Sequence, residues 1–235
     1  MKNKVLLIVL SVIVIGIVGV VIFLASNNNG KFDVITKEME ELKTAIKNAD
    51  DEKISDILTR VVSEGDYAEV EKAIKAYYKD YFGVIDSLSE NLSKANNVSS
   101  TYLITSNYNE DGKEFVNTKA ALEELKTNLD KDYKTYEEFF TSEEKSMSYI
   151  KDKNLGSNFE KYYKAQTKSS EQEKNDSINA MKDNIEKAKA KINAASDIIN
   201  FLVENASNWH IENDNLMMDT EELVQKYSEM ISKLG

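Results

Sequence analysis

The sequence predicts an all-α protein, an elongated antiparallel bundle of three to five long helices that follows one N-terminal transmembrane helix. Three observations lead to this prediction. Residues 5–25 form an uncharged apolar run, apolar residues recur at helical spacing over most of the remaining chain, and the 235 residues include no proline. Because proline breaks helices and makes up about 5% of average proteins, its absence favours long, continuous helices.

The apolar run, VLLIVLSVIVIGIVGVVIFLA, is long enough to cross a bilayer. At ~1.5 Å per helical residue it extends over about 31 Å, the thickness of the hydrocarbon core. Lys2 and Lys4 precede it, and residues 26–30 after it carry no charge. The positive-inside rule therefore places the N-terminus in the cytoplasm and the rest of the chain outside. The predicted parts are a cytoplasmic stub (1–4), a transmembrane anchor (5–25), a linker (26–31) and an extracytoplasmic helical-bundle domain (32–235).

The same N-terminal segment has a second interpretation as a cleaved secretory signal. Such signals share the basic start, but their apolar region is usually roughly 7–15 residues long and small residues precede the cleavage site. Here the run is longer, and Phe23 lies where cleavage after Ala25 would require a small residue. We therefore expect an uncleaved, single-pass signal-anchor in the cell membrane, with secretion after cleavage as the alternative.

Steps of three and four residues between apolar side chains predict the helices of the domain. A first helix spans 32–46, and its apolar face continues over 54–64 after a polar break. A long helix spans 66–95, and Gly83 in its interior either weakens it or lets a neighbouring segment approach closely. The remaining predicted helices begin near residue 117 or 118, at Thr141, at Ser157, near Ile178 and at Asp219.

The segment 178–202 has the strictest pattern, because its apolar residues follow heptad steps. Coiled-coil pairing and close packing within a bundle both produce this pattern. Two other stretches depart from helical spacing: 99–106 is compatible with a strand or a helix, and 208–218 predicts a small β-hairpin around an Asn213–Asp214 turn. The expected cross-strand partners are Trp209 and Ile211 on one strand, and Leu216 and Met218 on the other.

Charge and composition narrow the class of partner. The chain carries 30 basic and 41 acidic residues, and without Lys2 and Lys4 the exported part has 28 against 41, a formal charge of −13. This charge disfavours nucleic acid and anionic polymers as direct partners, and favours cationic partners or anionic ones bridged by divalent ions. The absence of cysteine excludes disulfides and thiolate catalysis.

No pattern predicts a catalytic residue, a cofactor site or a metal site. The nearest match to a calcium loop has oxygen-bearing side chains at alternate positions, Asn107, Asn109 and Asp111, followed by Gly112. Its twelfth position is Thr118 instead of glutamate, so we expect a surface turn here instead of a calcium site. The one histidine, His210, is too few for the histidine pairs that helical zinc and di-iron sites require.

Aromatic residues at helical spacing either fill the core or line a ligand groove. The core is the expected reading, with a groove as the alternative. The residues concerned are Tyr77, Tyr78, Tyr81 and Phe82, then Tyr133, Tyr136, Phe139 and Phe140, and finally Tyr162 and Tyr163.

These observations lead to an expected function. We expect a membrane-tethered extracytoplasmic helical-bundle module of the bacterial cell envelope that binds a protein partner and has no catalytic activity. The alternative is a structural, self-associating coiled-coil-like scaffold that forms homo-oligomers, and an envelope enzyme ranks third. The bacterial assignment depends on the frequent use of Lys, Asn, Ile and Glu, which is typical of AT-rich genomes.

Overall fold

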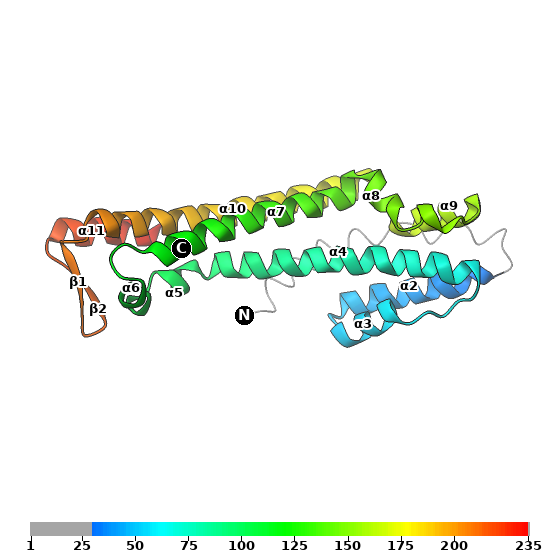
Figure 1. Cartoon of the computed structure of the whole chain (residues 1–235), viewed down its shortest axis with the longest axis horizontal. Helices are drawn as coiled ribbons and strands as arrows, with labels where there is room; N and C mark the ends of the chain where they lie inside the picture. The colour runs from blue at the N-terminus through cyan, green and yellow to red at the C-terminus, as the bar shows by residue number, and fades with distance from the viewer. Residues whose placement is uncertain (1–29, 235) are drawn as a thin grey trace. The chain divides into compact units, whose positions relative to one another are not determined.

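A computed structural model describes residues 30–234, and this part of the chain is mostly helical, with one small antiparallel sheet (Figure 1). The all-α prediction is therefore confirmed at that level. The predicted stub, the anchor and most of the linker lie outside the described residues. Within 30–234, no helix combines the length and the apolar composition that crossing a membrane requires.

The elements follow one another with short connections. They are α2 (Lys31–Lys47), α3 (Asp51–Thr59), α4 (Asp66–Asn96), α5 (Val98–Tyr102), α6 (Thr105–Asp111), α7 (Val116–Thr141), α8 (Glu143–Ser148), the 3₁₀ turn η1 (Lys151–Lys153), α9 (Ser157–Thr167), α10 (Glu171–Glu204), β1 (Trp209–Glu212), β2 (Asn215–Met218) and α11 (Glu221–Ser232). The chain divides into two compact units. Unit 1 holds the described residues up to Ser89 and Tyr133–Lys182, and unit 2 holds Glu90–Asp132 and Asp183 onward.

Unit 1 has an aromatic core. Phe32 of α2 stacks on Tyr162 of α9 with ring centroids 4.1 Å apart, and Tyr67 of α4 meets Phe32 edge-on at 4.8 Å. Tyr77 of α4 contacts Phe139 of α7 in the same edge-on way. The core interpretation of the aromatic stripes is confirmed for seven residues, which are buried: Tyr77, Tyr78, Tyr81, Tyr136, Phe139, Tyr162 and Tyr163.

Unit 2 is organised around the heptad residues of α10. Those of them that lie in unit 2 are buried, and they are Ile185, Ala188, Ile192, Ala195, Ile199 and Leu202. Trp209 extends this core, because its indole N–H donates to the carbonyl of Leu202 at 2.7 Å and its ring lies beside Tyr108 and Phe115. The indole is thus buried with its one donor satisfied.

The predicted β-hairpin is confirmed. Trp209 pairs with Met218 and Ile211 pairs with Leu216, across a two-residue turn. Asn213 and Asp214 have φ angles of 49° and 59°. A type I′ turn requires positive φ at both of these positions, and its twist matches that of the flanking strands.

Two local predictions need correction or completion. Residues 99–106 are helical in α5 and α6 apart from a short bend, so the strand alternative is wrong. The apolar helical face predicted over 54–64 is also wrong in its second half: α3 ends at Thr59, and Val61 and Val62 are 43% and 42% exposed. The backbone there is extended because its N–H groups bind a side chain of α4, as described below.

Two helix caps differ from the predictions by one residue, whereas α10 begins at Glu171, seven residues before the predicted start near Ile178. The side chain that caps α8 is Ser142, which accepts a hydrogen bond from the Lys145 N–H, instead of Thr141. Likewise Thr220, not Asp219, caps α11 by accepting from the N–H of Leu223. In each case a hydroxyl one residue later performs the expected role, because both neighbours are residue types that favour this position.

The left-handed turn gives a test of the hairpin. We expect Asp214→Gly to raise the free energy of unfolding by up to about 1 kcal/mol, because glycine adopts positive φ without strain. The matched control is Asp183→Gly in the interior of α10, which should lower the free energy of unfolding by roughly 0.3 kcal/mol. Chemical denaturation followed by circular dichroism measures both. Equal destabilisation by the two variants would contradict the turn assignment.

Candidate functional site

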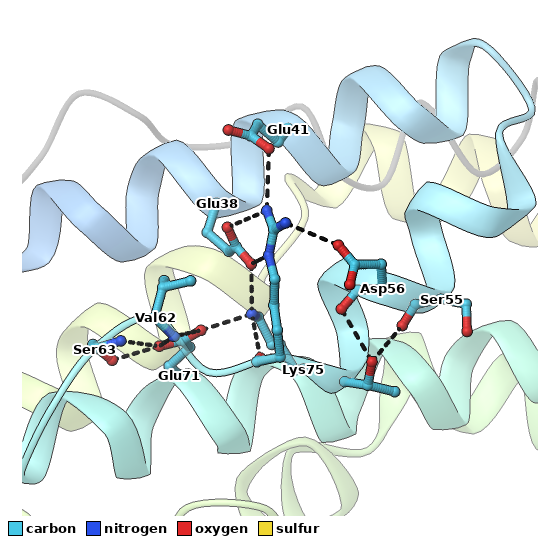
Figure 2. A network of polar contacts seen from close by, with 10 residues as sticks. Glu38, Glu41, Ser55, Asp56, Val62, Ser63, Glu71 and Lys75 are labelled. Carbon is cyan, nitrogen blue, oxygen red and sulfur yellow. Dashed lines mark hydrogen bonds and ion pairs between the residues drawn. The ribbon is translucent and has the colours of Figure 1, made fainter.

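A network of buried charges joins α2, α4 and the extended segment 60–64 of unit 1 (Figure 2). Its least exposed members are Glu38 of α2 and Glu71 and Lys75 of α4, with side chains 5%, 0% and 3% exposed. Arg60, just after α3, completes it. Lys75 and Arg60 match the buried carboxylates of Glu38 and Glu71, as buried ionic groups require to offset the loss of water. Arg60 also pairs with the exposed Glu41 and Asp56.

Lys75 is the hub of this network. Its ammonium lies 2.9 Å from a carboxylate oxygen of Glu38 and 2.6 Å from one of Glu71. It also donates to the backbone carbonyl of Arg60 at 2.9 Å. An ammonium group has three N–H donors, so each donor has one partner and none is left over.

The two carboxylates hold the chain between α3 and α4. Glu71 accepts hydrogen bonds from the backbone N–H groups of Val62 at 3.1 Å and Ser63 at 2.9 Å. Glu38 receives the guanidinium of Arg60 through two parallel bonds of 2.7 and 2.8 Å, a geometry that also fixes direction. These contacts explain why the chain is extended after α3 although its residues are apolar.

The protonation of the carboxylates follows from these partners. Burial alone raises the pKa of Glu38, but the hydrogen bonds from Arg60 and Lys75 outweigh it, so this pKa lies below its usual value. The same holds for Glu71, where Lys75 and Ser63 outweigh burial. Both groups are therefore ionised near neutral pH and fully engaged, which makes the network a structural support for α3.

An open groove of about 480 Å³ lies next to this support, between α3 and α4. Its volume falls within the range of small-ligand sites. Ser55 and Thr59 of α3 line it, one residue before the network members Asp56 and Arg60. The other lining residues are Ile46, Asp51, Ile54, Leu58, Lys79, Phe82, Gly83, Ile85 and Asp86.

Gly83 helps to keep this groove open. It lies in the interior of α4, and no atom comes within 4 Å of the position that a Cβ would occupy. The predicted close approach of a neighbouring segment is therefore wrong. Glycine inside a helix costs about 1 kcal/mol relative to alanine, so this position lowers stability without a packing reason.

The apolar lining is only partly covered. Phe82, Ile54 and Leu58 are half-buried, whereas Tyr77, Tyr78 and Tyr81 of α4 are buried. Phe82 therefore lines a groove, which was the alternative prediction for the aromatic residues, whereas Tyr78 and Tyr81 lie in the core. Apolar side chains gathered around a hollow are typical of ligand sites.

Two carboxylates share the groove without a cation between them. Asp86 is an exposed residue, but partial loss of water around its carboxyl raises its pKa above the usual value, and the negative charge of Asp51 raises it further. Within residues 30–234, no lysine, arginine or histidine forms an ion pair with either of them. Lys79 also lines the groove but lies seven residues from Asp86, about 10 Å along the helix axis.

A second hollow of about 340 Å³ lies in unit 1 among α7, α8, α9 and the start of α10, and Phe139 and Phe140 line it. Four of its five charged side chains are already paired, Lys168 being the exception. Lys164 lies 3.2 Å from Glu143, and Lys174 lies 3.6 Å from Glu171. The groove between α3 and α4 is therefore the stronger candidate site.

The calcium-loop residues serve a different purpose in unit 2. Asn107 and Asn109 lie inside α6, where alternate side chains cannot converge on one ion. Asp111 ends α6 and accepts from the backbone N–H groups of Asn117 at 3.0 Å and Thr118 at 2.7 Å. These bonds outweigh partial burial and lower the pKa of Asp111. Asp111 is thus a cap for the start of α7.

The other chemistry-bearing residues do not form a metal cluster. His210 is exposed on β1, opposite Met217. Over the described range 30–234, no three histidine, cysteine or carboxylate side chains are grouped so that they could hold a metal ion. The sequence did not predict that Asp51, Lys79 and Asp86 line a groove, because no spacing along the chain connects α3 with α4.

The network gives a stability prediction. We expect Lys75→Met to lower the free energy of unfolding by about 3–5 kcal/mol, because it leaves Glu38 and Glu71 buried without their cation. The control is Lys72→Met, which removes an exposed pair with Glu69 and should cost less than about 1 kcal/mol. Thermal unfolding of the full chain measures both, and equal losses would contradict the role of Lys75.

The groove gives a prediction about pH. A raised pKa in the folded state means that protonated Asp86 contributes stability below about pH 4, and this contribution is lost as the pH rises through the raised pKa. Asp86→Asn should therefore match the wild type in acid and become the more stable protein by pH 7. Asp51 and Lys79 face the same groove and remain in both proteins.

The measurement is the thermal midpoint at several pH values, with Asp183→Asn on the exposed face of α10 as the control. The control should show no gain that grows with pH. A constant difference between Asp86→Asn and the wild type at every pH would contradict the assigned titration.

Comparisons with protein-family models, with curated proteins and with solved structures found no match to this chain. No relative therefore supplies a site or an activity to transfer. The groove between α3 and α4 is therefore the structural basis for the function proposed below.

Proposed function

We propose that this chain is a membrane-tethered extracytoplasmic binding module of the bacterial cell envelope, and that its ligand site is the groove between α3 and α4. One observation carries the proposal: features that lower stability converge on this groove. They are the interior glycine Gly83, the half-buried apolar residues around Phe82, and the unpaired carboxylate of Asp86.

Two of these features could each be removed by a single substitution. An alanine at position 83 would strengthen the helix, and an asparagine at position 86 would remove a like-charge contact. Proteins commonly tolerate such local violations at functional sites, where an optimal fold would compete with binding.

The side chains of the groove favour binding over catalysis. The hydroxyl of Thr59 donates to the backbone carbonyls of Ser55 and Asp56, so it is engaged within α3. The described lining contains no histidine or cysteine. A nucleophile needs an adjacent base within hydrogen-bond reach, and these residues do not supply such a pair.

The location of the module is part of this proposal. Residues 5–25 serve as the uncleaved anchor, with residues 1–4 inside the cell and the antiparallel helical-bundle domain 32–235 outside. In this proposal the module acts by binding a protein partner in the envelope. Its acidic composition is compatible with a partner that carries basic groups.

Self-association is the second candidate function, and α11 favours it. No residue of this helix is fully buried. Leu223, Tyr227 and Ile231 are half-buried on the face where the Tyr227 hydroxyl lies 2.9 Å from that of Tyr108, and Val224 is 46% exposed on another face. A second copy of the chain is the occupant that a scaffold would place there. A concentration-independent monomer mass in sedimentation of the full chain would contradict the scaffold.

Filling the groove tests the binding proposal. We expect Gly83→Leu to raise the thermal midpoint, because it improves helix propensity and buries apolar surface in open space. It should also remove ligand from the groove. A benzophenone amino acid at Ser55 of the full chain, photolysed on intact cells, should form an adduct that is lost when Gly83→Leu is added.

Two controls make this experiment specific. Gly83→Ala improves helix propensity with little filling, so the adduct should persist. Benzophenone at the exposed Glu186 of α10 should not form the same adduct. An adduct that survives Gly83→Leu, or that forms equally from position 186, would overturn the groove as the ligand site.

A further inference from the structure

We propose that the groove between α3 and α4 binds a segment of a partner protein that presents a basic side chain, lysine or arginine, beside aliphatic residues. This inference rests on the proposed binding function and names its ligand class. The charge of the groove, its apolar lining and the place of each charge within it support this ligand class.

The carboxylates provide the charge argument. Asp51 comes from the first turn of α3 and Asp86 from the middle of α4, so two separate elements bring like charges to one groove. Their mutual repulsion is part of what raises the pKa of Asp86. A cation placed near both would replace this repulsion with two attractions, whereas an anion would add a third negative charge.

The apolar lining explains why the ligand is more than a cation. Ile54, Leu58 and Phe82 are half-buried, and each would lose water on contact with an aliphatic group. Lysine and arginine can make both kinds of contact, because their aliphatic stems pack on apolar surface while the charged end reaches a carboxylate. The ring of Phe82 adds a face on which a cation is also favoured.

Lys79 defines the orientation of the segment. It lies two helical turns before Asp86 on α4 and lines the same groove. It repels a basic group at its own end, and therefore directs the basic side chain of the ligand toward Asp51 and Asp86. Aliphatic neighbours of that side chain would then lie along Phe82 and Gly83.

The full chain in zwitterionic-lipid nanodiscs tests this inference by calorimetric titration, with empty nanodiscs subtracted. The probe is the peptide acetyl-Gly-Leu-Lys-Leu-Gly-amide, and its matched control carries glutamine in place of lysine. We expect the lysine peptide to bind about fivefold more tightly than the glutamine peptide. Asp86→Asn should remove most of this difference without weakening the glutamine peptide.

Two further variants separate the possible failures. Asp183→Asn, an exposed aspartate of α10, should leave the affinity of both peptides unchanged. Gly83→Leu should abolish binding of both. Equal affinities for the two peptides, or no binding by either, would overturn the charge inference, whereas peptide binding that survives Gly83→Leu would overturn the groove itself.

Discussion

The local structure of α2, α3 and α4 depends on one buried ammonium group. Lys75 is 3% exposed, and its three donors reach Glu38, Glu71 and the backbone of Arg60. The cost of removing this charge from water is offset only while all three partners remain in place. Because the partners come from different segments, the requirements of a single side chain also position α3, and therefore one wall of the groove.

Helix α4 carries two electrostatic environments with opposite properties. Around Lys75, each charge is matched and the pKa values of the carboxylates are lowered. Around Asp86, like charges meet and the pKa of the carboxyl is raised. The first environment stabilises the fold near neutral pH, whereas the second lowers stability there. This contrast separates a structural cluster from a candidate binding site more clearly than residue type does.

Periodicity predicted what depends on neighbours along the chain. The helices over 32–46 and 66–95 and the hairpin around Asn213 and Asp214 follow from apolar spacing and turn chemistry. The end of α3 could not be predicted in this way. Val61 and Val62 continue the apolar pattern, but the backbone N–H groups of Val62 and Ser63 donate hydrogen bonds to Glu71. In the sequence Glu71 resembles any acidic surface residue, and only the packing of 60–64 on α4 shows its partners.

The groove could not be predicted from the sequence either, because its walls come from helices that no spacing along the chain connects. Its geometry nevertheless shows which acidic residues could attract a cationic partner. The excess of acidic residues predicts a cationic partner, but exposed charges farther apart than about 8 Å are largely screened at physiological ionic strength. Glu38 and Glu71 are already neutralised within the fold. The proposed recognition of a basic group would therefore depend on carboxylates that share one hollow and adjoin apolar surface, as Asp51 and Asp86 do.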